Sequence, residues 1–176
     1  MSSHVFVDET KRRGYLLVAS AVVPGDLDAT RRMLRGLVLP GQRRAAYEGR
    51  ERLAQTLDRY RDRRQRHHGD HLRRRPRATD TERERRAACL TALVVDAAAR
   101  GDAMLVLEQD DTLVVSDRKL LYRATREAGC PDLRYEHRRA AVEQLLALPD
   151  AIAWCWAKGG DWRRRIQPIV THVREV

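Results

Sequence analysis

The stretch Met104-Leu105-Val106-Leu107-Glu108-Gln109-Asp110-Asp111 places four consecutive apolar residues directly before three acidic residues. A short continuous apolar run of this kind is typical of a strand that is covered on both faces, as in a parallel sheet. Open α/β sheets bind their ligands beyond the carboxyl ends of such strands. The sequence therefore predicts a strand over 103–109 whose acidic tip lies at a ligand-binding edge.

Acidic residues follow apolar residues at two other points of the chain. Asp8 and Glu9 follow an apolar run that predicts a first strand over 4–8, and Asp150 follows Leu148-Pro149 at an expected helix start. If the strands over 4–8 and 103–109 are parallel neighbours, their carboxyl ends lie side by side. Carboxylates packed this closely repel one another, which raises their pKa values or favours a bound cation.

Hard divalent ions prefer oxygen ligands, so Mg²⁺ or Mn²⁺ is the expected cofactor of this acidic set. Two such ions about 3.5–4 Å apart can stabilise the attacking and leaving oxygens of phosphodiester hydrolysis. The candidate catalytic residues are Asp8, Glu108, Asp111 and Asp150, and Asp110 joins them as a candidate metal ligand. The alternative is structural: Asp8 and Asp150 would cap turns or helices, and Asp110-Asp111 would be a solvated loop.

The charge balance indicates a polyanionic partner. The chain has 176 residues, which favours one domain with one core, and a formal net charge of +10. Such a field attracts phosphate chains, so nucleic acid is the expected partner, with DNA and RNA both open. Candidate nucleic-acid-binding residues are Arg63, Arg64, Arg66, Arg73, Arg74, Arg75, Arg163, Arg164 and Arg165.

An arginine-rich segment interrupts the pattern of apolar runs. Residues 58–86 hold twelve arginines against six acidic residues and very few apolar ones. A segment of this composition buries too little apolar surface to order itself. The middle of the segment, about 65–80, is therefore predicted to be a mobile insertion. The alternative interpretation, which is compatible with the first, is an arm that grips a phosphate backbone.

Several classes of protein are not expected. Three cysteines without a Cys-x-x-Cys pair indicate neither a zinc site nor a disulfide framework. The sequence shows no apolar signal segment and no membrane span, so a cytoplasmic location is expected. No Gly-rich phosphate loop and no Gly-x-Ser-x-Gly motif occurs, which argues against phosphate-loop nucleotide hydrolysis and serine esterase chemistry.

The remaining pattern predicts a mixed sheet with helices on both faces. The runs over 4–8 and 15–23 are expected to form an antiparallel hairpin, and strands then alternate with helices. Thr81 and Glu84 are expected to form a capping box, and Ser116 is expected to cap the next helix. The further expected strands are 43–48, 133–136 and 169–176, and the expected helices are 28–37, 50–64, 81–100, 116–128, 140–148 and one that Pro149 begins.

Other polar and aromatic groups have competing interpretations. His67, His68 and His71 include a pair with metal-ligand spacing, but their arginine-rich flanks favour a solvated loop. The three tryptophans Trp154, Trp156 and Trp162 favour core packing over base stacking. His137, at the end of a short strand, is a candidate acid or base near the acidic set.

The acidic points resemble an uncharacterised family with a ribonuclease H-like fold, whose members open with a strand ending in Asp-Glu-Ser. The residues that carry the resemblance are Val7-Asp8-Glu9, the acids at 108–111 and Leu148-Pro149-Asp150-Ala151-Ile152-Ala153. The similarity covers about 1–25 and 87–165. Thr10 stands where the family has serine, and the segment 58–86 has no counterpart in it.

The resemblance implies a single ribonuclease H-like domain over 1–176 in which Asp8, Glu108 or Asp111, and Asp150 bind two metal ions. It also implies a fourth acid, for which Glu48 and Glu51 are the candidates. The expected function is a metal-dependent nuclease that hydrolyses phosphodiester bonds by a two-metal mechanism. The alternative is a catalytically inactive basic module of the same fold that binds nucleic acid or a protein partner.

Overall fold

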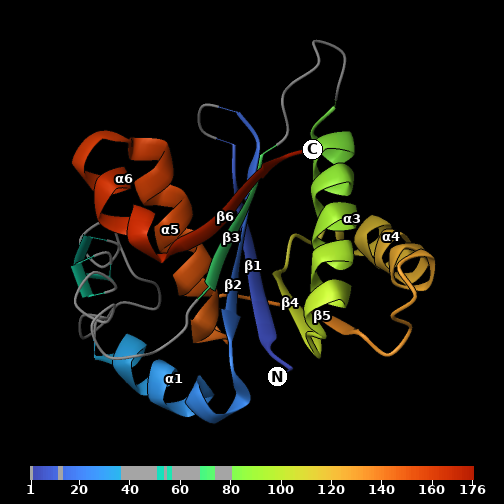
Figure 1. Cartoon of the computed structure of the whole chain (residues 1–176), viewed down its shortest axis with the longest axis horizontal. Helices are drawn as coiled ribbons and strands as arrows, with labels where there is room; N and C mark the ends of the chain where they lie inside the picture. Colours follow the sequence, from blue (N-terminus) through green and yellow to red (C-terminus); the bar gives the residue numbers. More distant parts are fainter. Residues whose placement is uncertain (1, 12–13, 37–50, 54, 57–67, 74–80) are drawn as a thin grey trace.

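The fold is a single six-stranded sheet between two layers of helices (Figure 1). The computed structural model describes residues 2–11, 14–36, 51–53, 55–56, 68–73 and 81–176. Side chains are described for all of these except 68–73. Within these residues no helix is long and apolar enough to cross a membrane.

The strands lie in the order β5-β4-β1-β2-β3-β6. Strands β1 and β2 form the predicted antiparallel hairpin, and β3 pairs antiparallel with β2. The pairs β1–β4, β4–β5 and β3–β6 are parallel, so the sheet is mixed as expected. The bounds are β1 His4–Thr10, β2 Leu16–Val22, β3 His68–Arg73, β4 Met104–Glu108, β5 Arg134–Arg138 and β6 Val170–Glu175.

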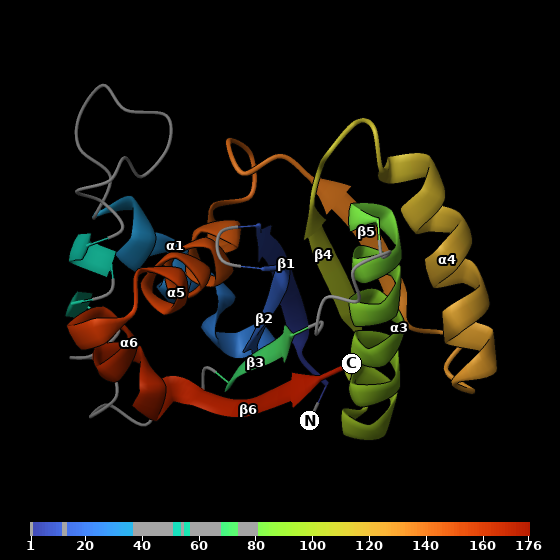
Figure 2. The same cartoon turned by 90° about the horizontal axis from the view of Figure 1, so that it is seen from above.

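Helices α3 and α4 cover one face of the sheet, and α1, α5 and α6 cover the other (Figures 1 and 2). Three short 3-10 turns, η1, η3 and η4, complete the described elements. The bounds are η1 Pro24–Asp26, α1 Leu27–Arg35, α3 Glu82–Arg100, α4 Val114–Glu127, η3 Gln144–Leu146, α5 Ala147–Lys158, α6 Gly160–Ile166 and η4 Gln167–Ile169.

The alternation of side chains along β1 explains why the core has two halves. Val5 and Val7 are buried against α3 in one apolar cluster, whereas Phe6 is buried on the opposite face against α5. Strand β4 behaves in the same way, with Leu105 and Leu107 on the α3 side and Val106 on the α5 side. Because both central parallel strands are covered on both faces, they need the continuous apolar runs that their sequences contain.

Helix α3 ends where its sequence predicts. The Thr81 side chain accepts a hydrogen bond from the backbone N–H of Glu84, and the Glu84 side chain accepts one from the backbone N–H of Thr81, which completes the capping box. At the other end, Gly101 takes a φ of +69°, a left-handed conformation that favours glycine. The 19-residue helix therefore lies fixed across β1, β2 and β4.

Strand β3 corrects one expectation. It lies within the segment 65–80 that the sequence predicts to be a mobile loop, so this prediction is wrong for 68–73. The strand is ordered by backbone pairing with β2 on one side and β6 on the other, which a composition argument based on side-chain burial does not consider. The expected strand over 43–48 and most of the expected helix over 50–64 lie outside the described residues, as does the remainder of 65–80.

Two helix starts also differ from their predictions. Helix α4 begins at Val114, and the Ser116 hydroxyl donates to the carbonyl of Leu113 instead of capping the helix. The expected helix over 140–148 is a turn followed by η3, and α5 then begins at Ala147, so Pro149 lies in its first turn. The missing N–H of proline has no helical partner at this position, which is why the helix accepts it.

Candidate functional site

The register of two parallel strands brings the first two predicted acids together. Val7 of β1 lies opposite Leu107 of β4, so Asp8 and Glu108 follow at the same carboxyl edge of the sheet. Both residues line a cleft of about 700 Å³. The lining residues are Val7, Asp8, Glu9, Thr10, Lys11, Arg86, Glu108, Gln109, Asp110, Asp111 and Thr112.

Asp8 lies at the floor of this cleft and is nearly buried, with 9% of its surface exposed. Its Oδ1 accepts a hydrogen bond of 2.7 Å from the backbone N–H of Glu9. Burial, together with the charge and hydrogen bond of Glu108 and the charge of Asp150, raises the pKa of Asp8 to about 8. The carboxylates of Glu108 on β4 and of Asp150 in the first turn of α5 therefore both act electrostatically on Asp8.

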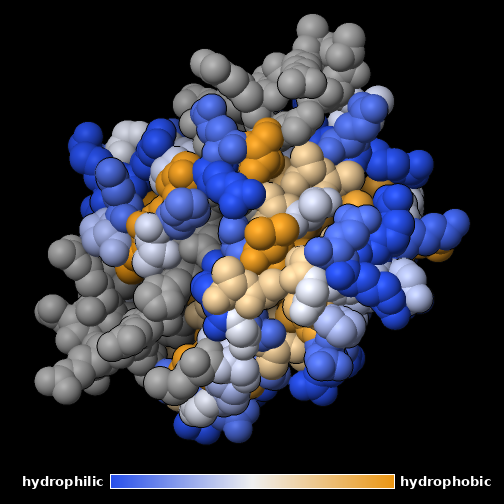
Figure 3. All heavy atoms as spheres, turned by 45° about the vertical axis from the view of Figure 1, so that its right-hand side comes forward, coloured by the Kyte–Doolittle hydropathy of each residue, from blue (hydrophilic) through white to orange (hydrophobic). Residues whose placement is uncertain are grey.

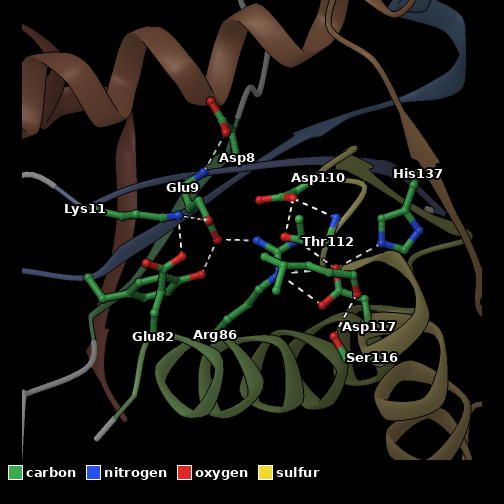
Figure 4. Close-up of polar contacts among 12 residues, drawn as sticks. Asp8, Glu9, Lys11, Glu82, Arg86, Asp110, Thr112, Ser116, Asp117 and His137 are labelled. Atoms are coloured by element: carbon green, nitrogen blue, oxygen red, sulfur yellow. Dashed lines mark hydrogen bonds and ion pairs between the residues drawn. The ribbon is translucent and has the colours of Figure 1, made fainter.

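Asp8 and Glu9 point to opposite faces of the sheet. Successive side chains of a strand alternate in direction, and Figure 4 shows Asp8 directed toward α5 and Glu9 directed toward Arg86 on α3. The two adjacent acids consequently enter different environments. Asp8 meets other carboxylates, whereas Glu9 meets a cation.

Glu9 belongs to a buried network centred on Arg86 (Figure 4). The Arg86 guanidinium donates one bond to Glu9 and binds Asp117 with its other nitrogens, at 3.0 Å from Nε to Oδ1 and 2.8 Å from Nη2 to Oδ2. The Tyr15 hydroxyl also donates to Glu9, and His137 Nε2 lies 3.0 Å from Asp117 Oδ2. The network ties β1, β2, α3, α4 and β5 together behind the cleft.

Electrostatics hold this network in its charged form. Burial opposes the charge of Arg86, but the hydrogen bond to Asp117 and the charge of Glu9 outweigh it and raise the pKa of Arg86. Burial likewise opposes the charge of Asp117, yet the bonds to His137 and Arg86 lower the pKa of Asp117. Burial and the Glu9 charge both raise the pKa of Tyr15, so its phenol stays protonated and donates. Such a buried set is stable only while each member keeps its partner.

The last two predicted acids lie on the rim of the cleft and have other partners. Asp110 Oδ1 accepts hydrogen bonds from the backbone N–H and the hydroxyl of Thr112, at 3.0 and 2.6 Å, and these bonds lower the pKa of Asp110. Asp111 accepts from Gln109 at 2.5 Å and forms an ion pair of 2.9 Å with Arg139. The structure therefore groups Asp8, Glu108 and Asp150, and places Asp110 and Asp111 beside this group in contacts of their own.

Of the two candidates for a fourth acid, only Glu51 is described, and it pairs with a cation of α5. Glu51 lies 3.3 Å from the Lys158 ammonium, and Glu48 lies outside the described residues. Among the residues whose positions are described, no three His, Cys, Asp or Glu side chains already form a metal-coordinating arrangement. The donor set of Asp8, Glu108 and Asp150 nevertheless fits a hard divalent ion by its chemistry, because it offers carboxylate oxygens, and burial together with the charges of Glu108 and Asp150 raises the pKa of Asp8. Metal binding there requires the carboxylates to rotate from the positions they take here.

Of the candidate nucleic-acid-binding arginines, only three have side chains that the structure describes. Arg163 stacks on Trp156 with its guanidinium carbon 3.8 Å from the ring centroid, Arg165 lies 5.5 Å from the centroid of Trp162, and Arg164 pairs with Asp161. Arg73 lies in β3, where only the backbone is described. Arg63, Arg64, Arg66, Arg74 and Arg75 lie outside the described residues, as does His67.

Two of the tryptophans pack together as the core interpretation expects. Trp154 is buried, and its ring meets that of Trp162 edge to face with centroids 5.2 Å apart. The Lys158 ammonium lies over both rings, 4.4 and 4.6 Å from their centroids. The aromatic groups of α5 and α6 are thus joined to cations, a contact that stabilises by about 0.5–1 kcal/mol at exposed sites.

The central role of Arg86 was not predicted, although the sequence carries a signal for it. Arg86 precedes Leu90, Leu93 and Ala97 at helical spacing on the buried stripe of α3, and Asp117 lies on the corresponding stripe of α4. A charged residue on an apolar stripe must find an opposite charge inside the protein. Two such residues on adjacent helices therefore indicate a buried ion pair.

Comparison with known proteins decides the fold. No protein-family model and no curated protein matches the sequence. The structure of RNase HII from Archaeoglobus fulgidus, solved in complex with PCNA, is similar over 94% of this chain and 75% of that one, with a TM-score of 0.54 and 15% identity. The fold is ribonuclease H-like. A mutant of Bst-RNase HIII is also similar, over 86% of this chain and half of its own, with a TM-score of 0.44 and 14% identity.

The ribonuclease H-like fold confirms the fold that the acidic motifs imply. The predicted strand pair and the helices on both faces of the sheet occur as expected. At this level of identity the likeness concerns the fold and leaves the chemistry of Asp8, Glu108 and Asp150 to be argued from their own geometry.

Replacement of Arg86 by glutamine should destabilise the protein by about 3–5 kcal/mol, because it leaves the buried carboxylates of Glu9 and Asp117 without their cation. Urea denaturation of the purified variant measures this loss. The exposed Arg83, one turn earlier on α3, provides a matched control, and Arg83→Gln should change the unfolding free energy by less than about 0.5 kcal/mol. Equal effects of the two substitutions would contradict the network.

The raised pKa of Asp8 predicts how stability depends on pH. A carboxyl whose pKa is higher in the folded state binds more protons there, so its contribution is present below the ordinary value of 3.8 and is lost as pH rises through about 8. In EDTA, the unfolding free energy of the wild type should fall between pH 5 and pH 9 relative to that of Asp8→Asn. Urea denaturation at each pH measures this difference. The control Asp111→Asn, at an exposed residue, should keep the wild-type dependence of unfolding free energy on pH. If all three proteins show the same dependence, the pKa of Asp8 is not raised.

Proposed function

We propose that this chain is a metal-dependent nuclease that hydrolyses phosphodiester bonds, with Asp8, Glu108 and Asp150 holding Mg²⁺ or Mn²⁺. The observation that supports the proposal is the position of Asp8: it lines a cleft of about 700 Å³ together with Glu108, and the charges of Glu108 and Asp150 both act on it. Ligands of open α/β sheets bind at this edge. A nuclease needs such an acidic centre together with a basic surface that holds its substrate.

The charge pattern inside the cleft supports a cation at the Asp8 side and not at the Glu9 side. Arg86 and Lys11 already pair with Glu9, whereas the group around Asp8 consists of acids that repel one another. A divalent ion would offset this repulsion. When bound, Mg²⁺ or Mn²⁺ would supply the charge that stabilises the attacking and leaving oxygens of the phosphodiester.

The acidic side chains of the cleft would bind the cation. Asp8 would bind the cation as a carboxylate, and its Oδ1 accepts a hydrogen bond from the backbone N–H of Glu9 in the present structure. Asp110 and Asp111 on the rim are further candidate ligands. Asp111 can reach the centre by leaving its exposed pair with Arg139, which costs little because exposed ion pairs contribute about 0.2–1 kcal/mol.

The basic residues would hold the nucleic acid. Arg163 and Arg165 lie over tryptophan rings, and such stacked guanidinium groups can contact phosphates with their outer nitrogens. The arginines of 63–75 remain proposed contacts of the same kind. Because the structure of similar fold is named RNase HII, RNA-containing strands are the first substrates to test, beside DNA.

A second function is favoured by the contacts of the rim. Asp110 is engaged by Thr112 and Asp111 by Arg139, and the described acids do not form a ready metal-coordinating set. A chain that binds nucleic acid on its basic surface without cleaving it would show these features too. Binding without hydrolysis distinguishes this module from the nuclease.

Cleavage assays with labelled single-stranded RNA, single-stranded DNA, duplex DNA and an RNA–DNA hybrid, each with Mg²⁺ or Mn²⁺, test the proposal. We expect the wild type to cut at least one of them, and Asp8→Asn or Asp150→Asn to slow cutting by more than about 100-fold, since even partners of metal ligands cost 10- to 100-fold. The exposed Asp132 provides a control of the same chemistry, and Asp132→Asn should retain the wild-type rate.

The same cleavage assays can also contradict the proposal. No cutting of any substrate that the wild type binds would support the non-catalytic module and overturn the nuclease. Cutting that survives in both Asp8→Asn and Asp150→Asn would place the chemistry elsewhere. A slow Asp111→Asn variant would add Asp111 to the ligands.

A further inference from the structure

A second hollow lies away from the acidic cleft, between α4 and β5. Its volume is about 690 Å³, and its lining residues are Arg118, Lys119, Tyr122, Arg123 and Tyr135. Helix α4 is the outermost helix of its layer, and β5 is the last strand at this side of the described sheet (Figure 2). Figure 3, which brings this side of the molecule forward, shows hydrophilic side chains gathered on its right-hand part.

The cations of the hollow are not neutralised by neighbouring acids. Arg118, Lys119 and Arg123 are exposed and form no ion pair with any residue that the structure describes. Residues four apart on a helix lie on the same face, so Lys119 and Arg123 are adjacent, as are Arg118 and Tyr122. Of the two acids of α4, Asp117 is buried and already binds Arg86 and His137, and Glu127 lies four residues after Arg123 but forms no ion pair with it. The hollow therefore presents an uncompensated positive charge.

Two tyrosine rings form the wall of the hollow. Tyr122 is 52% exposed, and Tyr135 rises from β5 with its ring partly packed against the core. The Arg126 guanidinium lies 3.5 Å from the centroid of the Tyr122 ring, which fixes the orientation of an otherwise exposed side chain. Exposed aromatic rings beside unpaired cations are the two components with which proteins bind single nucleic-acid strands.

We propose that this hollow binds a single strand of nucleic acid, with bases stacked on Tyr122 and Tyr135 and phosphates paired with Arg118, Lys119 and Arg123. Its size is in the range of small-ligand pockets, about 300–1,000 Å³, and suits a short stretch of one strand better than a duplex. The rings favour this partner over an acidic peptide, whose carboxylates would use the cations alone. The site requires no metal ion and goes beyond the proposed nuclease centre.

The chain connects the hollow directly to the acidic cleft. Residues 110–113 run from the rim of the cleft into α4, and Arg118 lies about one helical turn from the start of that helix. A strand held in the hollow would therefore extend toward the cleft. Binding in the hollow stands without hydrolysis, so a loss of cutting and a loss of this contact are separate results.

Fluorescence anisotropy of labelled single-stranded oligonucleotides with the full chain in EDTA tests the site without cleavage. We expect Tyr122→Ala to weaken binding by about 5- to 100-fold, the range for loss of one stacked base, and Tyr122→Phe to bind like the wild type. The double variant Arg118→Gln/Arg123→Gln should lower the slope of log affinity against log salt by about 1.4, at about 0.7 for each lost phosphate contact on a single strand.

Matched controls distinguish the hollow from general basicity. Arg32 and Arg35 are exposed cations of α1 on the opposite side of the sheet, and Arg32→Gln/Arg35→Gln removes the same charge. An equal loss of affinity and slope in the two double variants would overturn the site, since it would show that only net charge matters. Circular dichroism melting of each variant confirms that it is folded.

The remaining outcomes concern the class of partner. If Tyr122→Ala leaves oligonucleotide binding unchanged but abolishes binding of a labelled polyglutamate peptide, the hollow binds acidic protein segments and the proposal is wrong. If Tyr122→Ala weakens oligonucleotide binding while cleavage is absent even in the wild type, the hollow is supported and the nuclease is not.

Discussion

Consecutive side chains of a β-strand must point to opposite faces of the sheet, and this constraint separates Asp8 from Glu9. The two carboxylates are adjacent in the sequence but belong to different layers of the protein. Glu9 enters the layer of α3 and α4, where Arg86 binds it together with Asp117. Asp8 enters the layer of α5, where Glu108 and Asp150 are its neighbours.

The separation of Asp8 from Glu9 has opposite electrostatic consequences on the two faces of the sheet. On the Glu9 side the buried charges of Arg86 and Asp117 are paired, and the network of Glu9, Arg86, Asp117 and His137 joins β1, α3, α4 and β5 behind the cleft. On the Asp8 side the protein supplies further negative charge, which raises the pKa of Asp8 and costs stability whenever Asp8 ionises. Buried like charges of this kind are found where a protein binds or transforms a ligand. The Arg86 network stabilises the fold, and the acids around Asp8 are the candidate functional site.

The sequence predicted the parts of the site that depend on local patterns. The continuous apolar runs before Asp8 and Glu108 identified two parallel, doubly covered strands, and parallel strands necessarily bring their carboxyl ends to one edge. Asp150 was predicted because the Leu148-Pro149 pair indicated a helix start. These features need only strand and helix periodicity, and the register of β1 and β4 brings Asp8 and Glu108 to one edge of the sheet.

Features that depend on pairing between distant segments were not predicted. Strand β3 has few apolar residues and is ordered by its neighbours β2 and β6, so composition indicated a loop instead. Asp110 is hydrogen-bonded to Thr112, and Asp111 forms an ion pair with Arg139. A run of acidic residues in the sequence does not show which distant cation pairs with one of its members. The hollow between α4 and β5 likewise requires Tyr122 and Tyr135 to meet from separate elements.

Isothermal titration of Mn²⁺ into the metal-free protein measures most directly whether Asp8, Glu108 and Asp150 form one cation site. We expect the wild type and Asp132→Asn to bind with micromolar affinity, and Asp8→Asn and Asp150→Asn each to abolish binding, although their positions are far apart in the sequence. Wild-type protein that binds no Mn²⁺, with or without an oligonucleotide present, would contradict the site. Binding that either variant retains would show that the two acids do not share a cation.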